Sequence, residues 1–130
     1  MYLKSPKVIV WEEMPYPTCF QLDLFKARLK DITHPRKSYV MVVNLINTPR
    51  PDSVYRSELV NFLKANRGLI KRYFLATGNI GLINICVELT AKIAGVHDIS
   101  TFTTFDQAIR KGESYASSRL ISDPSKLKQN

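Results

Sequence analysis

VMVVNLINTPRPDSVYRSEL, residues 40–59, passes from an apolar run through a loop with two prolines into a stretch with helical spacing. The run begins at residue 38 as SYVMVVNLI and is rich in β-branched residues, which is typical of a central strand buried on both faces. Asp52 or Ser53 can cap the helix that follows. Its expected core face consists of Tyr55, Leu59, Phe62 and Leu63. This pattern predicts a strand-to-helix junction, where α/β proteins commonly bind ligands, phosphates and partners.

The alternation of strands and helices continues on both sides of this junction. Short apolar runs predict strands at residues 7–11, 38–46, 72–77 and 98–104. Apolar residues at spacings of three and four predict helices that begin near Thr18, Ser53, Leu82 and Phe105. The first of these helices should end before Pro35, and Gly95 should lie just past the third. Thr104 and Gln107 match a capping box at the start of the last helix.

The order β-α-β-α-β-α-β-α predicts one small α/β domain with a mainly parallel sheet of four strands. Most helices are expected on one face of that sheet. The domain should span residues 1–121, followed by a polar tail at residues 122–130.

The charge of the chain is positive and evenly spread. Its 130 residues carry a formal net charge of +8, and the pI is near 9.7. Residues 1–65 hold 10 Lys/Arg against 6 Asp/Glu, and residues 66–130 hold 9 against 5, so each half has a net charge of +4. Arg67, Lys71 and Arg72 come closest to a cluster. We therefore expect a solvated basic surface or one that faces an acidic protein, with nucleic-acid binding as the alternative.

The sequence indicates a soluble, cytoplasmic protein with no cofactor. No apolar run approaches the ~18 residues of a membrane-spanning helix, and MYLKSPKVIVWEEMP lacks the long apolar core of a signal peptide. Cys19 and Cys86 are too few for a disulfide framework and are expected to be buried free thiols. No Cys or His has another at ligand spacing, so no metal site is expected.

Residues 48–56, which we call the docking surface, combine charge with apolar side chains at the predicted junction. Arg50 and Arg56 could hold an acidic group of a partner, although Arg56 could also pair with Asp52 or be solvated. Val54 and Tyr55 would offer apolar contact if they are not buried. The candidate partner-binding residues are Arg50, Asp52, Ser53, Val54, Tyr55 and Arg56.

Ser53 is also a candidate for phosphorylation. A phosphate there would face free backbone N–H groups and the positive end of the helix dipole. The simpler interpretation is that Ser53, or Asp52, only caps the helix.

Other motifs carry weaker functional signals. Thr77-Gly78-Asn79-Ile80-Gly81 precedes a helix and could bind an anion, but it lacks the Lys-Ser or Lys-Thr of a P-loop and is better interpreted as a turn. His34 and His97 have no Ser or Cys beside them in a catalytic arrangement, so no enzymatic activity is expected. Trp11, Tyr16 and Phe20 either form an exposed aromatic surface or close the core. The strand at residues 7–11 could be a sheet edge that pairs with a second copy in a homodimer.

Three stretches together resemble a known family. SYVMVVNLI runs into a polar loop and a helix that opens with Ser53, and RYFLAT is followed by a short turn and GLINICVELTAKIAG. The third stretch is HDISTFTTFDQAIRKG, with its pattern of Phe102, Thr104, Asp106, Ala108 and Ile109. On these grounds residues 38–111 resemble the STAS-type domains, the family of the bacterial anti-sigma-factor antagonists.

The resemblance implies a regulatory signalling module that docks a protein partner, often a kinase-like or switch protein, rather than an enzyme. In many family members, phosphorylation at the start of the helix after the central strand controls docking, and Ser53 occupies the matching position. PRPDSVYRS stands here in place of the family's Asp-Ser-Ser-Gly or Asp-Ser-x-Gly form. The alternatives are an anion- or nucleic-acid-binding module, and a small-molecule or lipid-binding domain with a pocket between the first helix and the sheet.

Overall fold

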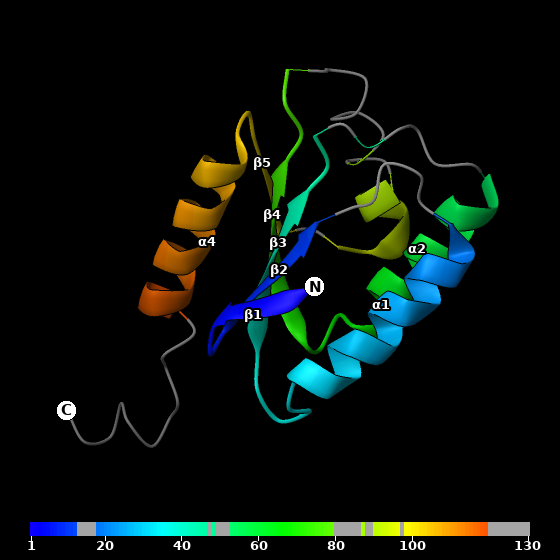
Figure 1. Cartoon of the computed structure of the whole chain (residues 1–130), viewed down its shortest axis with the longest axis horizontal. Coiled ribbons are helices and arrows are strands. Elements are labelled where there is room, and N and C mark those ends of the chain that lie inside the picture. The colour runs from blue at the N-terminus through cyan, green and yellow to red at the C-terminus, as the bar shows by residue number, and fades with distance from the viewer. Residues whose placement is uncertain are drawn as a thin grey trace.

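A single sheet with helices packed on both of its faces forms the centre of the computed structural model (Figure 1). The structure describes residues 1–12, 18–46, 48, 53–79, 87, 90–96 and 98–119. From residue 8 onward, strands and helices alternate as the sequence predicts, and the α/β class is confirmed.

The strands follow one another across the sheet in chain order, β1-β2-β3-β4-β5. The pair β1 and β2 is antiparallel, whereas β2 to β5 are parallel to one another. Parallel strands joined through helices need cover on both faces, and Val40, Met41 and Val42 at the centre of the sheet are fully buried. The strand bounds are β1 Tyr2–Ser5, β2 Val8–Glu12, β3 Tyr39–Asn44, β4 Ile70–Ala76 and β5 Ile99–Phe102.

The prediction of four strands is wrong, because the sheet also contains β1. Three of the four β1 residues are exposed, so this strand has no apolar pattern from which to predict it. Pro6 and Lys7 form the turn that folds β1 back onto β2. As a result, residues 7–11 are not at a sheet edge, and the predicted pairing of that strand with a second copy is wrong, since β1 occupies the position.

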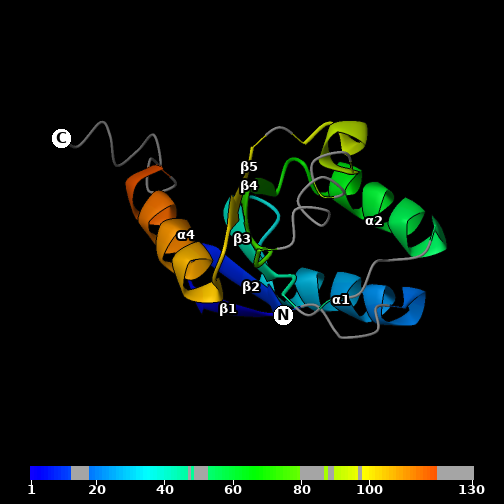
Figure 2. The same ribbon diagram turned by 90° about the horizontal axis from the view of Figure 1, so that it is seen from above.

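Most helices cover one face of the sheet, as predicted. Figure 2 shows α1 (Cys19–Ile32), α2 (Ser53–Ala65) and the helical residues 90–94 on the same side, and α4 (Phe105–Arg119) alone on the other. The core on the α1 and α2 face is built from large side chains. They include Ile9, Trp11, Met41 and Val43 from the strands and Leu22, Leu29, Tyr55 and Phe62 from the helices.

The core on the α4 face uses smaller side chains, so that helix lies close to the sheet. Ala108 and Ala116 of α4 pack against Val40, Val42 and other residues of β2, β3 and β4. A Cβ atom at Gly112 would lie 2.7 Å from Cγ2 of Val42. Gly112 therefore has a packing role in α4.

Local hydrogen bonds fix where the helices begin. Thr18 is the N-cap of α1, and its hydroxyl accepts a hydrogen bond from the Gln21 backbone N–H at 3.2 Å. The predicted capping box of α4 is confirmed. The Thr104 N–H donates to Gln107 Oε1 at 3.3 Å, and the Gln107 N–H donates to Thr104 Oγ1 at 3.2 Å. Gly95, at φ 75°, follows the helical residues 90–94, which also agrees with the prediction.

We predict that Gly112→Ala lowers the free energy of unfolding. The new methyl group would collide with the buried, β-branched side chain of Val42, and overpacking of this kind costs ~1–3 kcal/mol. Alanine is favoured over glycine inside a helix by about 1 kcal/mol, which offsets part of that cost. Urea unfolding should therefore show a net loss of about 1 kcal/mol.

Gly68→Ala is the matched control, because a Cβ atom at Gly68 meets nothing within 4 Å. It should leave the unfolding midpoint unchanged or raise it slightly. Equal midpoints for the two variants would show that α4 does not depend on close approach at Gly112.

Candidate functional site at the carboxyl edge of the sheet

The carboxyl ends of the parallel strands meet at one edge of the sheet. Backbone hydrogen bonds join neighbouring strand ends there: the Leu45 N–H donates to the Ala76 carbonyl at 2.8 Å, and the Thr77 N–H donates to the Phe102 carbonyl at 2.9 Å. Ligands of open α/β sheets bind outside this edge, because the connecting loops are free to shape a site there. Of the docking surface, the structure describes residues 48 and 53–56, which follow β3 along the chain.

The start of α2 exposes part of the docking surface. Ser53, Val54 and Arg56 are exposed, and 63% of the Val54 surface is accessible. The helix α2 begins at Ser53. Asp52 and Arg50 lie outside the described residues, so the predicted pairing of Arg56 with Asp52 stays a prediction.

Tyr55 belongs to the core and not to the surface. Only 3% of its surface is exposed, and it packs in the cluster between α2 and the sheet. Tyr55 was expected to contact a partner only if it was exposed. Because it is buried, it does not offer that contact. Within the first turn of α2, Tyr55 therefore packs into the core, whereas Val54 and Arg56 face outward.

The strand ends of β4 and β5 create a crevice at the same edge. After β4 the chain continues to the helical residues 90–94 on the α1 and α2 face, where Val87 and Val96 pack against the core. After β5 it continues into α4 on the opposite face (Figure 2). Where the connections of neighbouring parallel strands leave toward opposite faces, a crevice opens between them, and this is the usual ligand position in such folds. By contrast, α1 and α2 follow β2 and β3 on the same face.

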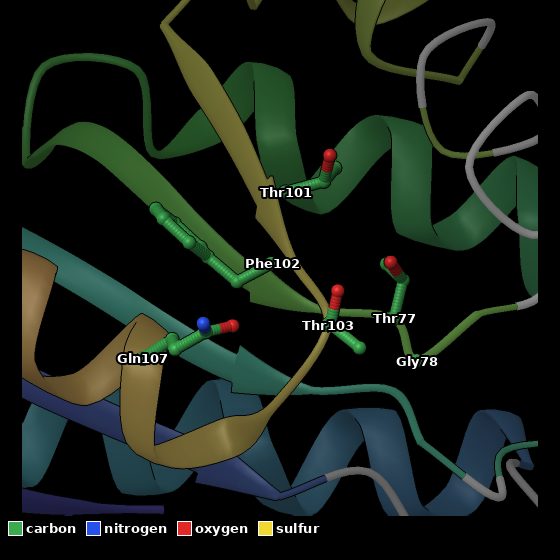
Figure 3. Close-up of a pocket in the computed structure, with 6 residues that line it drawn as sticks. All are labelled: Thr77, Gly78, Thr101, Phe102, Thr103 and Gln107. Carbon is green, nitrogen blue, oxygen red and sulfur yellow. The ribbon is translucent and has the colours of Figure 1, made fainter.

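A pocket of about 240 Å³ occupies this crevice. Figure 3 shows three threonine side chains from the ends of β4 and β5, with their hydroxyl groups pointing the same way, and the Gln107 side chain reaching toward the end of β5 from the first turn of α4. The described lining residues are Thr77, Gly78, Thr101, Phe102, Thr103 and Gln107. The lining is therefore mainly hydroxyl and amide groups.

Thr77 is the most informative residue of the pocket. It is 2% exposed and is the only polar residue classed as buried within the described part of the chain. Its backbone N–H is engaged by the Phe102 carbonyl, but none of the hydrogen bonds found among the described residues uses its hydroxyl. The Thr77 Oγ1 is not one of the fully buried atoms that lack a partner, so it is accessible from the pocket, where it can donate to a ligand or water.

The other predicted contact residues separate into core and surface. Trp11 is 2% exposed and closes the core against Phe25 and Phe62, with ring centroids 5.0 and 5.5 Å away. Phe20 is 71% exposed, and Tyr16 lies outside the described residues. The space between α1 and the sheet, suggested by sequence as a ligand pocket, holds these packed rings together with Leu22 and Leu29.

The sequence cluster of Arg67, Lys71 and Arg72 does not form one basic patch. Adjacent strand residues point to opposite faces of a sheet, and Lys71 is exposed while Arg72 is half-buried on the α4 face. The Arg72 guanidinium lies 5.6 and 5.3 Å from the ring centroids of Phe74 and Tyr115. Its Nη2 donates to Ser100 Oγ at 2.7 Å, so Arg72 packs as part of the fold.

Metal-ligating side chains do not gather within the described residues. No three side chains of His, Cys, Asp and Glu come together there as a metal site, and none of the helices described is long and apolar enough to cross a membrane. Burial raises the pKa of the Tyr73 hydroxyl, which therefore stays protonated. Cys19 is a free, partly buried thiol.

Comparisons of the chain with protein-family models, curated proteins and solved structures find no match. The resemblance to STAS-type domains therefore stays a prediction. What the site can do has to be argued from its geometry and chemistry.

The crevice was not predicted as a site, although its parts were recognised. Residues 77–81 were identified as a turn, and Thr104 with Gln107 as a capping box. Their proximity follows from the last helix crossing to the opposite face. Helical spacing identifies the apolar side of a helix but does not show which face of the sheet that side will cover.

We predict that Thr77→Val leaves the free energy of unfolding unchanged or raises it. Valine has nearly the same shape, and replacing a buried hydroxyl that has no protein partner is neutral or stabilising. Thr18→Val is the matched control, because it removes the hydroxyl that caps α1 and should cost about 1 kcal/mol. Urea unfolding of both variants measures the difference. A loss at Thr77 as large as that at Thr18 would show that the Thr77 hydroxyl has a structural partner.

Proposed function

We propose that this chain is a non-enzymatic regulatory module that binds a protein partner through the exposed start of α2. The observation that supports this proposal is the position of Val54. An apolar side chain with 63% of its surface accessible stands in the first turn of the helix that follows β3, next to exposed Ser53 and two residues before exposed Arg56. Covering one such side chain contributes ~1.5 kcal/mol or more, and the polar neighbours supply specificity.

The charge around Val54 favours a partner with acidic groups. The amino-terminal end of α2 carries the positive end of the helix dipole, and exposed Arg56 adds a full charge. Glu58, the acidic residue nearest to them along α2, pairs with Lys26 of α1 at 3.5 Å, which offsets its charge. A partner that places a carboxylate against Arg56 and an apolar side chain against Val54 would satisfy both features.

Phosphorylation of Ser53 is the form of regulation that belongs to this proposal. Ser53 is exposed, and it is the first residue of α2. A phosphate would add a charge of roughly −1.5 to −2 and would be stabilised by the free N–H groups of the first turn. It would add negative charge to the docking surface and so weaken binding of an acidic partner. The resemblance to STAS-type modules supports the same position, since in many members of that family phosphorylation at the start of the helix after the central strand controls docking.

We predict that Arg56→Glu weakens partner binding by about tenfold or more, because it opposes an acidic partner with a like charge. The melting temperature should stay within ~4 °C, since substitutions at exposed sites change stability by about 0.5 kcal/mol. The partner would be captured from lysate at low and high salt, identified, and then titrated against purified protein by calorimetry.

Arg110→Glu is the control, because Arg110 is exposed on α4, on the opposite face, and the charge change is the same. If both variants weakened partner binding equally, the change in net charge alone would explain the loss of affinity. That result would contradict a local docking surface. Recovery of nucleic acid that is lost at high salt, in place of a protein, would favour the nucleic-acid alternative, since phosphate contacts release counterions.

A further inference from the structure

The crevice between β4 and β5 offers hydrogen-bond donors that the fold does not use. Thr77, Thr101 and Thr103 place three hydroxyl groups along one side of the pocket (Figure 3). Of these, Thr77 is 2% exposed, and none of the hydrogen bonds among the described residues involves its hydroxyl. A hydroxyl can rotate to donate to whatever acceptor enters the pocket.

Gln107 adds donors of fixed direction. Its Oε1 accepts the Thr104 backbone N–H at 3.3 Å as part of the capping box. The capping bond therefore orients the side chain and leaves the NH₂ group, with its two N–H donors, free for a ligand. Gln107, in the first turn of α4, thus both takes part in the cap of the helix and carries a donor group at the pocket.

The electrostatic surroundings favour a negative ligand. No charged side chain belongs to the described lining. The amino-terminal end of α4 begins beside the pocket, at Phe105, and carries the positive end of a helix dipole. Asp106 in the first turn of α4 is exposed and is not part of the described lining. The pocket therefore has hydrogen-bond donors that the protein does not use, no carboxylate in its described lining, and the positive end of a helix dipole beside it. These features together favour a ligand that is rich in hydrogen-bond acceptors.

We propose that this crevice binds a phosphate group. Phosphate presents three strong acceptor oxygens in a tetrahedral arrangement, which can engage the hydroxyl donors at the two strand ends and the amide donors of Gln107. The pocket of about 240 Å³ is slightly below the ~300–1,000 Å³ typical of ligand sites, so it suits inorganic phosphate or the phosphate end of a larger molecule. This site is separate from the docking surface and does not require that surface to bind a protein.

Titration of uniformly ¹⁵N-labelled protein with inorganic phosphate, followed by backbone amide shifts, tests the proposal. The largest shifts should be at Gly78, Thr103 and Thr104, and they should saturate with a Kd of about 1 mM or tighter. Chloride at matched ionic strength should not produce these shifts. A parallel titration with phosphoserine separates the two sources of phosphate: tighter binding identifies a phosphomonoester, and equal or weaker binding identifies free phosphate.

Gln107→Glu is the decisive variant. Glutamate keeps the acceptor that the capping box needs, so the fold should persist, but it replaces the two N–H donors by a negative charge. Phosphate binding should weaken by about tenfold or more. Ser117→Glu makes a similar charge change ten residues further along α4, ~15 Å away at 1.5 Å per residue, and should bind phosphate as the wild type does.

Shifts that fail to saturate would overturn the proposal, as would shifts spread over the basic surface of the protein. Phosphate binding by Gln107→Glu with wild-type affinity would also overturn it, because the donors that define the site would then be irrelevant. If Gln107→Glu proves unfolded, Thr77→Val replaces it. That variant removes the buried hydroxyl alone and should weaken phosphate binding by about threefold or more.

Discussion

The burial of β3 on both faces is the constraint on which the rest of the structure depends. Val40 and Val42 face α4, whereas Met41 and Val43 face α1 and α2, so one strand supplies both cores. Side chains alternate strictly along a strand, so slipping by one residue would exchange the two sets. The larger side chains belong to the face with more helices, and the valines belong to the face that α4 approaches closely through Gly112.

This division of the core also determines where sites can form. The helices after β2 and β3 return over the same face of the sheet, and their amino-terminal ends therefore lie on that side of the carboxyl edge. Only α4, after β5, crosses to the valine face (Figure 2). The crevice at β4 and β5 results from that single change of face. Its polar lining is consistent with its position, since strand ends beyond the core do not need apolar side chains.

The sequence was sufficient to predict the elements that have a clear apolar pattern or are bounded by a proline or a capping motif. The β-branched run at residues 38–46 predicted β3, Pro35 bounded α1, and Thr104 with Gln107 located the start of α4. It was insufficient for β1, whose exposed side chains resemble those of a loop. It placed Tyr55 on the core face of α2, which its burial confirms, but it also named Tyr55 beside Val54 as a contact residue, and of these two only Val54 is exposed.

The candidate site was harder to predict than the fold, since a site depends on which strand ends become neighbours. Thr77 and Thr103 are far apart in the chain and come together only because β4 and β5 are adjacent and parallel. The pairing of β3 with β4 likewise brings the segments that follow these two strands together. A Cβ atom at Gly78 would lie 3.8 Å from Cγ1 of Ile46, in the segment that leads to the docking surface.

Neighbouring strand ends lie about 4.8 Å apart, which is less than the Debye length of ~8 Å at physiological salt. A phosphate in the crevice would therefore reduce the positive potential at the adjacent strand end without moving any part of the fold. An acidic group bound at that strand end would then be held less tightly. By linkage, such a group would weaken phosphate binding by the same factor. Two anion-binding positions at neighbouring strand ends can influence each other in this way through charge alone, without a conformational switch.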